Sequence, residues 1–134
     1  MRLNLRPALL LLILLFSLGA AAHAPRPTPP DSSYVLALAA ANRFLGAWQT
    51  GDLETGMVLV SDHARHAQNP EKFEEFFSGR GGRGFEITRG KGNRGRYSFP
   101  VILVTTQGSA VRRRTSQIVV VNTGKDDWVV DKLP

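Results

Sequence analysis

Ala41-Asn-Arg-Phe-Leu-Gly-Ala-Trp-Gln-Thr-Gly-Asp52 joins two predicted helices and sets the direction of the chain. Gly51 can take the left-handed conformation that ends a helix, and Asp52 can cap the next helix with its carboxylate. Upstream, apolar residues recur every three or four positions, as on the buried face of a helix. The pattern predicts a long helix that begins near Ser33. Its buried face consists of Tyr34, Leu38, Ala41, Leu45 and Trp48, widened by Val35 and Phe44.

Three further helical segments are predicted before Gly79. Asp52 begins a helix over 53–60, and Ser61 or Asp62 begins a short helical turn that reaches His66. Asn69-Pro70-Glu71 then combines a cap, a proline at the first helical position and an acid at the positive end of the helix dipole. This third full helix is expected to bury Phe73, Phe76 and Phe77.

After Gly79 the pattern changes to strands separated by glycine-rich turns. Strands are expected over 85–89, 96–106, 112–122 and 128–133, with turns at 90–95, 107–109 and 123–127. One face of the second strand carries Tyr97, Phe99, Val101 and Leu103. Pro100 cannot donate to a ladder, so it predicts an edge or a bulge. The expected fold is α+β, with N-terminal helices packed on an antiparallel meander of about four strands.

The N-terminus has the three parts of a secretory signal. Arg2 and Arg6 supply positive charge, residues 8–18 are apolar apart from Ser17, and residues 19–24 are small enough for cleavage. The apolar run is too short for a typical membrane span. We expect an exported protein, periplasmic or secreted, cleaved after Ala22, with retention of the signal as an anchor as the alternative.

These features divide the chain into three regions. Residues 1–22 are the predicted signal peptide, 23–32 a proline-rich tether, and 33–134 a single folded domain. A core of about 100 residues suits one domain. The sequence contains no cysteine, which excludes a disulfide and a lipid-modified N-terminal cysteine.

Two segments of the domain resemble the nuclear transport factor 2-like superfamily. They are Phe44-Leu-Gly-Ala-Trp-Gln-Thr-Gly-Asp52 before a helix and Gly124-Lys-Asp-Asp-Trp-Val-Val-Asp131 in the last strand. The resemblance covers residues 33–133 and implies a long helix across a strongly curved sheet, forming a cone with a cavity. Members of this superfamily include polyketide cyclases, isomerases, dehydratases and exported domains without a known activity, so the fold alone does not select a function.

Catalysis of the cyclase or isomerase type needs an acid or a histidine inside the cone. The central strand segments 97–103 and 118–121 contain no Asp, Glu or His, and only Tyr97 offers a donor there. A pocket in this position would be lined by Phe44, Trp48, Tyr97 and Phe99. We therefore expect no catalytic residue, and we keep an enzyme or a small-molecule pocket as the alternative.

The segment Asp62-His63-Ala64-Arg65-His66 holds two histidines three residues apart. On a helix they can share a face and approach one metal ion or one proton. A zinc site usually needs a third protein ligand, and none is evident nearby. We interpret the segment as a polar turn, with no metal and no cofactor expected.

Charge is distributed unevenly along the chain. Residues 31–77 contain three basic and seven acidic residues, whereas residues 78–124 contain nine basic residues and one acid. Seven of the basic residues form a candidate polyanion-binding surface: Arg89, Lys91, Arg94, Arg96, Arg112, Arg113 and Arg114. Gly79-Arg-Gly-Gly-Arg-Gly-Phe85 also resembles an arginine-glycine RNA-binding segment, but export makes a nucleic acid an unexpected partner. A solvated basic edge that prevents unwanted strand pairing is the simpler alternative.

The sequence therefore favours an exported, non-enzymatic binding module. Its expected partner is an unknown protein or an anionic component of the cell envelope, bound through arginines by charge and counterion release. A periplasmic assembly subunit and a homodimer are the further alternatives, since an open sheet can pair with another copy. No specific nucleic acid and no membrane span after cleavage are expected.

Overall fold

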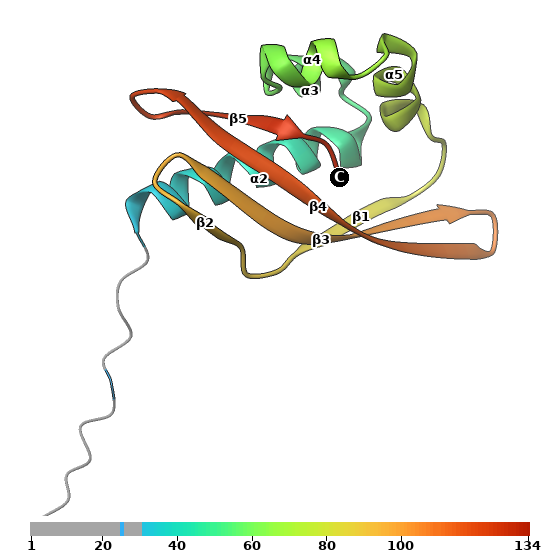
Figure 1. Cartoon of the computed structure of the whole chain (residues 1–134). Coiled ribbons are helices and arrows are strands. Elements are labelled where there is room, and N and C mark those ends of the chain that lie inside the picture. Colours follow the sequence, from blue (N-terminus) through green and yellow to red (C-terminus); the bar gives the residue numbers. More distant parts are fainter. Residues whose placement is uncertain (1–24, 26–30) are drawn as a thin grey trace, which may run out of the picture.

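The computed structural model describes Pro25 and residues 31–134 of the chain (Figure 1). The predicted signal peptide and most of the tether lie outside these residues. Within them, helices α2 (Ser32–Thr50), α3 (Leu53–Val58), α4 (Asp62–Ala67) and α5 (Pro70–Ser78) precede one antiparallel sheet. Its strands are β1 (Arg83–Ile87), β2 (Lys91–Asn93), β3 (Arg96–Gln107), β4 (Ala110–Gly124) and β5 (Asp127–Lys132). The α+β fold class is confirmed.

Local capping chemistry explains where the helices start and stop. Asp31 begins α2 by accepting a hydrogen bond from Ser33 N at 3.3 Å. Gly51 ends it at φ 72°, and its N–H donates to the carbonyls of Ala47 and Trp48. Asp52 then caps α3 by accepting from Thr55 N at 3.0 Å. The turn between the two predicted helices is therefore confirmed.

Two details of the helical prediction are wrong. Val35 does not widen the buried face of α2, because its side chain is 48% exposed. The second helix ends at Val58 and does not reach Val60. Backbone hydrogen bonds explain this early end: Val130 N donates to Leu59 O, and Ser61 N donates to Val130 O, each at 2.8 Å. Residues 59–61 therefore pair with the outer edge of β5 and do not continue the helix.

The sheet has the order β1-β3-β4-β5, and β2 pairs with β3 beside β1. The predicted turn at 90–95 therefore contains a fifth strand, β2, joined to β3 by a tight turn. Pro100 lies on β3, which has neighbours on both sides, so its edge alternative is wrong. Its carbonyl accepts from Thr88 N at 3.0 Å, where the chain passes between β1 and β2. Pro100 N faces the same side but carries no hydrogen, so the reciprocal bond to Thr88 O is absent, and the β1–β3 ladder ends at Ile87.

The core lies between α2 and one face of the sheet, which Figure 1 shows crossed by the helix. Tyr97, Phe99, Val101 and Leu103 are all buried on this face, as predicted. Phe44 packs against Phe77 of α5, with ring centroids 5.7 Å apart. Of the described helices, none is both long enough and apolar enough to cross a bilayer.

Candidate anion-binding cleft

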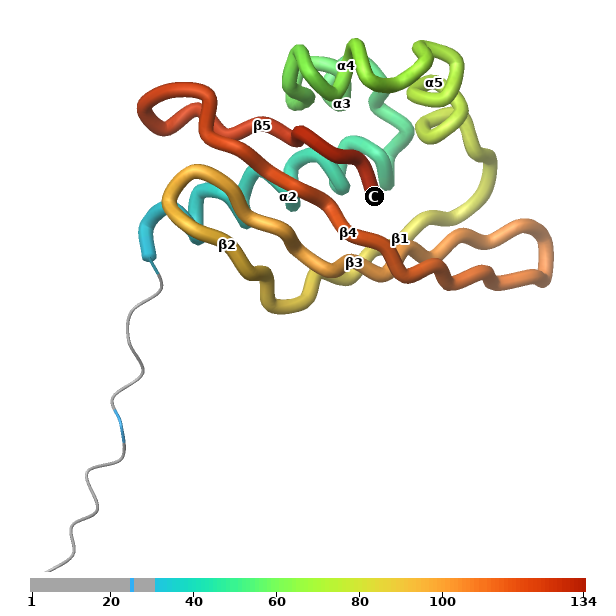
Figure 2. Tube along the Cα trace, in the orientation of Figure 1, coloured from blue at the N-terminus to red at the C-terminus, as the bar shows by residue number. Residues whose placement is uncertain are grey.

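The seven basic residues of the predicted surface do not form one patch. Arg89, Lys91, Arg94 and Arg96 lie around β2 and the start of β3, whereas Arg112, Arg113 and Arg114 lie on β4 near the β3–β4 turn. Figure 2 shows these regions at opposite ends of the long hairpin. The span from Arg96 to Leu103, the residue opposite Arg114, is seven residues, or about 23 Å of strand. Any single small ligand therefore meets only one group.

The arginine triplet is divided between the two faces of the sheet. Residues directly opposite each other in an antiparallel pair point to the same face. Arg114 pairs with buried Leu103, and Arg112 pairs with Thr105, so both face the side that carries α2. Arg113 pairs with Val104 and faces the other side. Alternation along β4 thus brings two of the three guanidinium groups to one wall.

This wall belongs to an open cleft of about 350 Å³ between the β3–β4 hairpin and the ends of α2 and α5. The cleft contains apolar surface, three arginines and one carboxylate: its lining is Trp48, Glu75, Phe76, Gly79, Arg83, Leu103, Thr105, Arg112 and Arg114. A second cleft of about 390 Å³ shares Glu75, Phe76 and Arg114 with it and extends to Leu133 and Pro134. Together they provide a groove with room for an extended or a branched anion.

Arg83 forms the floor of the cleft, and the sequence prediction of site residues did not include it. Its Nη1 donates to Trp48 O at 2.6 Å, and its Nη2 donates to Phe77 O at 2.8 Å and to Gly79 O. The guanidinium carbon also lies 5.4 Å from the Trp48 ring centroid. Partial burial lowers the pKa of Arg83. Because three carbonyls occupy its forked edge, Arg83 holds the ends of α2 and α5 together and has little donor capacity left for a ligand.

Trp48 and Phe76 form the aromatic wall of the cleft. Trp48 Nε1 donates to Phe76 O at 3.0 Å, and the two rings stack with centroids 5.7 Å apart. Of the four residues predicted to line a pocket, Trp48 borders this cleft, whereas Phe44 and Phe99 are fully buried in the core. Tyr97 is also buried, and its hydroxyl donates to Asp31 at 3.1 Å. Burial, followed by this bond to a carboxylate, raises the pKa of Tyr97.

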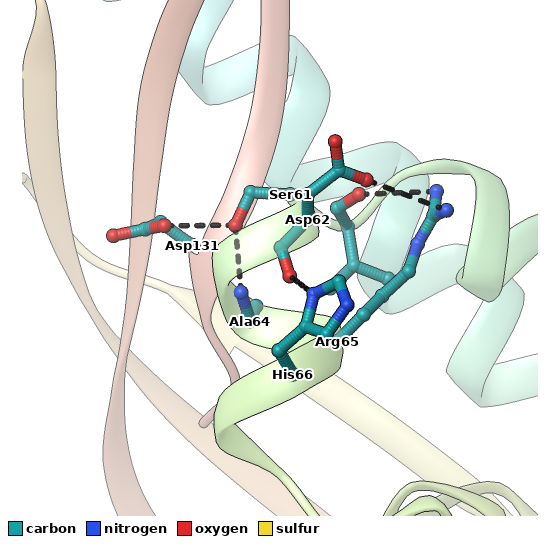
Figure 3. A network of polar contacts seen from close by, with 7 residues as sticks. Ser61, Asp62, Ala64, Arg65, His66 and Asp131 are labelled. Carbon is teal, nitrogen blue, oxygen red and sulfur yellow. Dashed lines mark hydrogen bonds and ion pairs between the residues drawn. The ribbon is translucent and has the colours of Figure 1, made fainter.

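The Asp62–His66 segment forms α4, where its polar groups bind one another (Figure 3). His66 Nδ1 lies 2.6 Å from Asp62 O, and Arg65 pairs with the Asp62 carboxylate at 3.7 Å. Among the described residues, no cluster of three His, Cys, Asp or Glu side chains is suited to hold a metal ion. The contacts are local to one short helix.

Ser61 links α4 to the sheet. Its hydroxyl accepts from Ala64 N at 3.0 Å, which caps the helix, and donates to Asp131 at 2.8 Å (Figure 3). Asp131 also pairs with Arg96 at 3.0 Å. Desolvation raises the pKa of Asp131, but the hydrogen bonds from Ser61 and Arg96 outweigh it, and the pKa is lowered overall. One of the seven predicted ligand-binding residues, Arg96, is thus engaged in a structural ion pair.

The lowered pKa of Asp131 predicts a loss of stability in acid. The stabilisation by this carboxylate is complete above the unfolded pKa, about 4, and disappears as pH falls through the folded pKa. Asp131→Asn should therefore cost about 1 kcal/mol at pH 7 and much less at pH 3, measured by urea unfolding. Exposed Asp126→Asn is the matched control and should leave the free energy of unfolding almost unchanged at both pH values. An equal cost of Asp131→Asn at both pH values would contradict the prediction.

Comparison of the chain with protein-family models, with curated proteins and with solved structures gives no match. The resemblance to the nuclear transport factor 2-like superfamily therefore stays a prediction.

Proposed function

We propose that the protein is an exported, non-enzymatic binding module that recognises an anionic partner through Arg112 and Arg114. One observation supports this most strongly: two exposed arginines on alternate positions of β4 face one cleft whose described lining has a single carboxylate, Glu75. Guanidinium groups held this way attract phosphate, sulfate or carboxylate and can bind them bidentately. The N-terminal signal pattern supports the exported location.

The lining also supports binding more than catalysis. The polar side chains of the cleft are three arginines, one threonine and one glutamate. A hydrolase or isomerase needs a nucleophile or a base oriented by a partner, and no such hydrogen-bonded pair lies among the described residues of the cleft. Without a nucleophile or an oriented base, the arginines can hold a charged ligand but offer no group to convert it.

Polyphosphate is a suitable first probe, because it presents closely spaced negative charges without other chemistry. Replacing Arg112 and Arg114 with serine should weaken polyphosphate binding at least tenfold and flatten its salt dependence. Arg89→Ser with Arg94→Ser is the matched control, since it removes the same charge from the other end of the hairpin. Titration by fluorescence anisotropy at two salt concentrations measures both effects. Equal losses in the two double variants would indicate general attraction without a site, and no binding by the wild type would refute the proposal.

A small organic anion in the cleft is the second candidate. Its volume of about 350 Å³ falls in the range of ligand pockets. Trp48, Phe76 and Leu103 provide an apolar wall beside the arginines, which polyphosphate does not use. An aromatic carboxylate that binds more tightly than an equally charged inorganic anion would favour this candidate.

A further inference from the structure

We propose that the anionic partner is an acidic peptide segment that binds in extended form and adds an antiparallel strand to the outer edge of β4, along residues 111–117. This inference rests on the proposed function, because the same arginines supply the attraction. It adds the chemical class of the partner and the backbone groups that recognise it. Strand addition is an established mode of peptide recognition at open sheet edges.

The hydrogen bonds of the sheet show which backbone groups of β4 face outward. Thr88 N donates to Pro100 O, and Thr106 N donates to Gly82 O, so the even residues of β3 face β1 and β2. The odd residues of β3 therefore face β4, where their partners are even-numbered. It follows that odd residues of β4 direct both N–H and C=O away from β3, as in any antiparallel strand. On the segment considered, these are Val111, Arg113, Thr115 and Gln117.

This edge is open among the described residues. The register of β5 on β4 runs from Gly124 to Val119 and stops there. Beyond it, Leu133 enters the core, and Pro134 O accepts from the Arg114 side chain on the helix-facing side. All four outward-facing residues are exposed, and Val111 is 64% exposed. Figure 2 shows the corresponding end of the hairpin extending past β5. Four consecutive donor–acceptor pairs are thus available to an incoming strand.

Charge determines which occupant fits. A second copy of the chain, paired edge to edge in a register centred on Arg113 or Arg114, places arginines directly opposite arginines, which is destabilising. A peptide with acidic residues at alternate positions instead places carboxylates opposite Arg112 and Arg114, on the side of the cleft. Only a polypeptide also supplies N–H and C=O groups at the repeat of a strand. The edge and the cleft therefore point to the same acidic peptide.

The probe is a capped ten-residue peptide of alternating threonine and glutamate, tested with the wild-type protein. When glutamate lies opposite Arg112 and Arg114, threonine lies opposite the odd residues of β4, and its amides form the new ladder. N-methylation of the threonine amides should weaken binding at least tenfold, measured by fluorescence anisotropy. N-methylation of the glutamate amides should leave the affinity within about twofold, because those amides face solvent. The two methylated peptides have the same charge and composition.

The outcomes separate this inference from the proposed function. Equal binding of the two methylated peptides, or tighter binding of the threonine-methylated one, would overturn strand addition and leave anion binding intact. Binding of polyphosphate without binding of the unmodified peptide would do the same. Failure of both polyphosphate and the peptide to bind would refute both proposals together.

Amide hydrogen exchange gives an independent check. With the unmodified peptide bound, exchange at Val111, Arg113, Thr115 and Gln117 should slow at least tenfold, whereas polyphosphate should leave it unchanged. Even-numbered amides such as that of Arg114 serve as internal controls, because they already bond to β3. A bound peptide that leaves the odd amides unprotected would contradict the inference.

Discussion

Replacing Gly81 with alanine is expected to destabilise the protein by about 3 kcal/mol. Gly81 has φ 106°, a conformation that side chains rarely adopt, and a Cβ atom there would collide with the carbonyl oxygen of Thr106. The backbone of β3 cannot move away easily, because Thr106 N is bonded to Gly82 O at 2.9 Å. Urea unfolding of the two proteins measures the loss.

Gly84→Ala is the matched control for this prediction, from the same glycine-rich segment. A Cβ atom at Gly84 would meet nothing within 4 Å. Its replacement should change the free energy of unfolding by about 0.5 kcal/mol or less. If both alanine variants were equally stable, the close approach of Gly81 to β3 would be disproved.

Arg83→Met is expected to cost about 3 kcal/mol of stability, the second large effect. The substitution keeps an unbranched apolar stem but removes the donors for the carbonyls of Trp48, Phe77 and Gly79. These carbonyls lie where α2 and α5 end, so unpaired C=O groups remain beside the core. Thermal or urea unfolding reports the loss.

Two further variants test the cause of this effect. Arg83→Lys keeps the charge but lacks the planar fork, so it should recover less than half of the lost stability. Exposed Arg80→Met removes one nearby positive charge and should have almost no effect. Equal losses at Arg80 and Arg83 would attribute the effect to net charge and would contradict the role of the three hydrogen bonds.

The parts of the fold that depend on neighbouring residues were predictable from the sequence. Asp52 and Asn69 cap helices and Gly51 ends one, because the necessary groups lie within a few positions of each other. The errors arise where distant segments meet. Val60 lies outside the helix because its neighbours Leu59 and Ser61 form hydrogen bonds with Val130 of β5. The exposed strand β2 forms only because it pairs with β3.

The candidate site was predictable only in part, for a related reason. Composition indicated the basic surface, but it did not separate Arg89 from Arg112, which lie at opposite ends of one hairpin. That Arg112 and Arg114 share a face follows from strand alternation, a signal that the sequence contains. Their position over the cleft depends on their register with β3, and the contacts of Arg83 depend on where two helices end.

The intrinsic fluorescence of Trp48 can report on the cleft. The chain has two tryptophans, and Trp128 is buried beside Tyr97, with ring centroids 5.8 Å apart. In a Trp128→Phe variant, the remaining emission would come from Trp48, which contacts the Arg83 guanidinium and borders the site. The protein thus carries an intrinsic fluorophore at the position where an anionic partner is expected, and occupancy can be followed without a label.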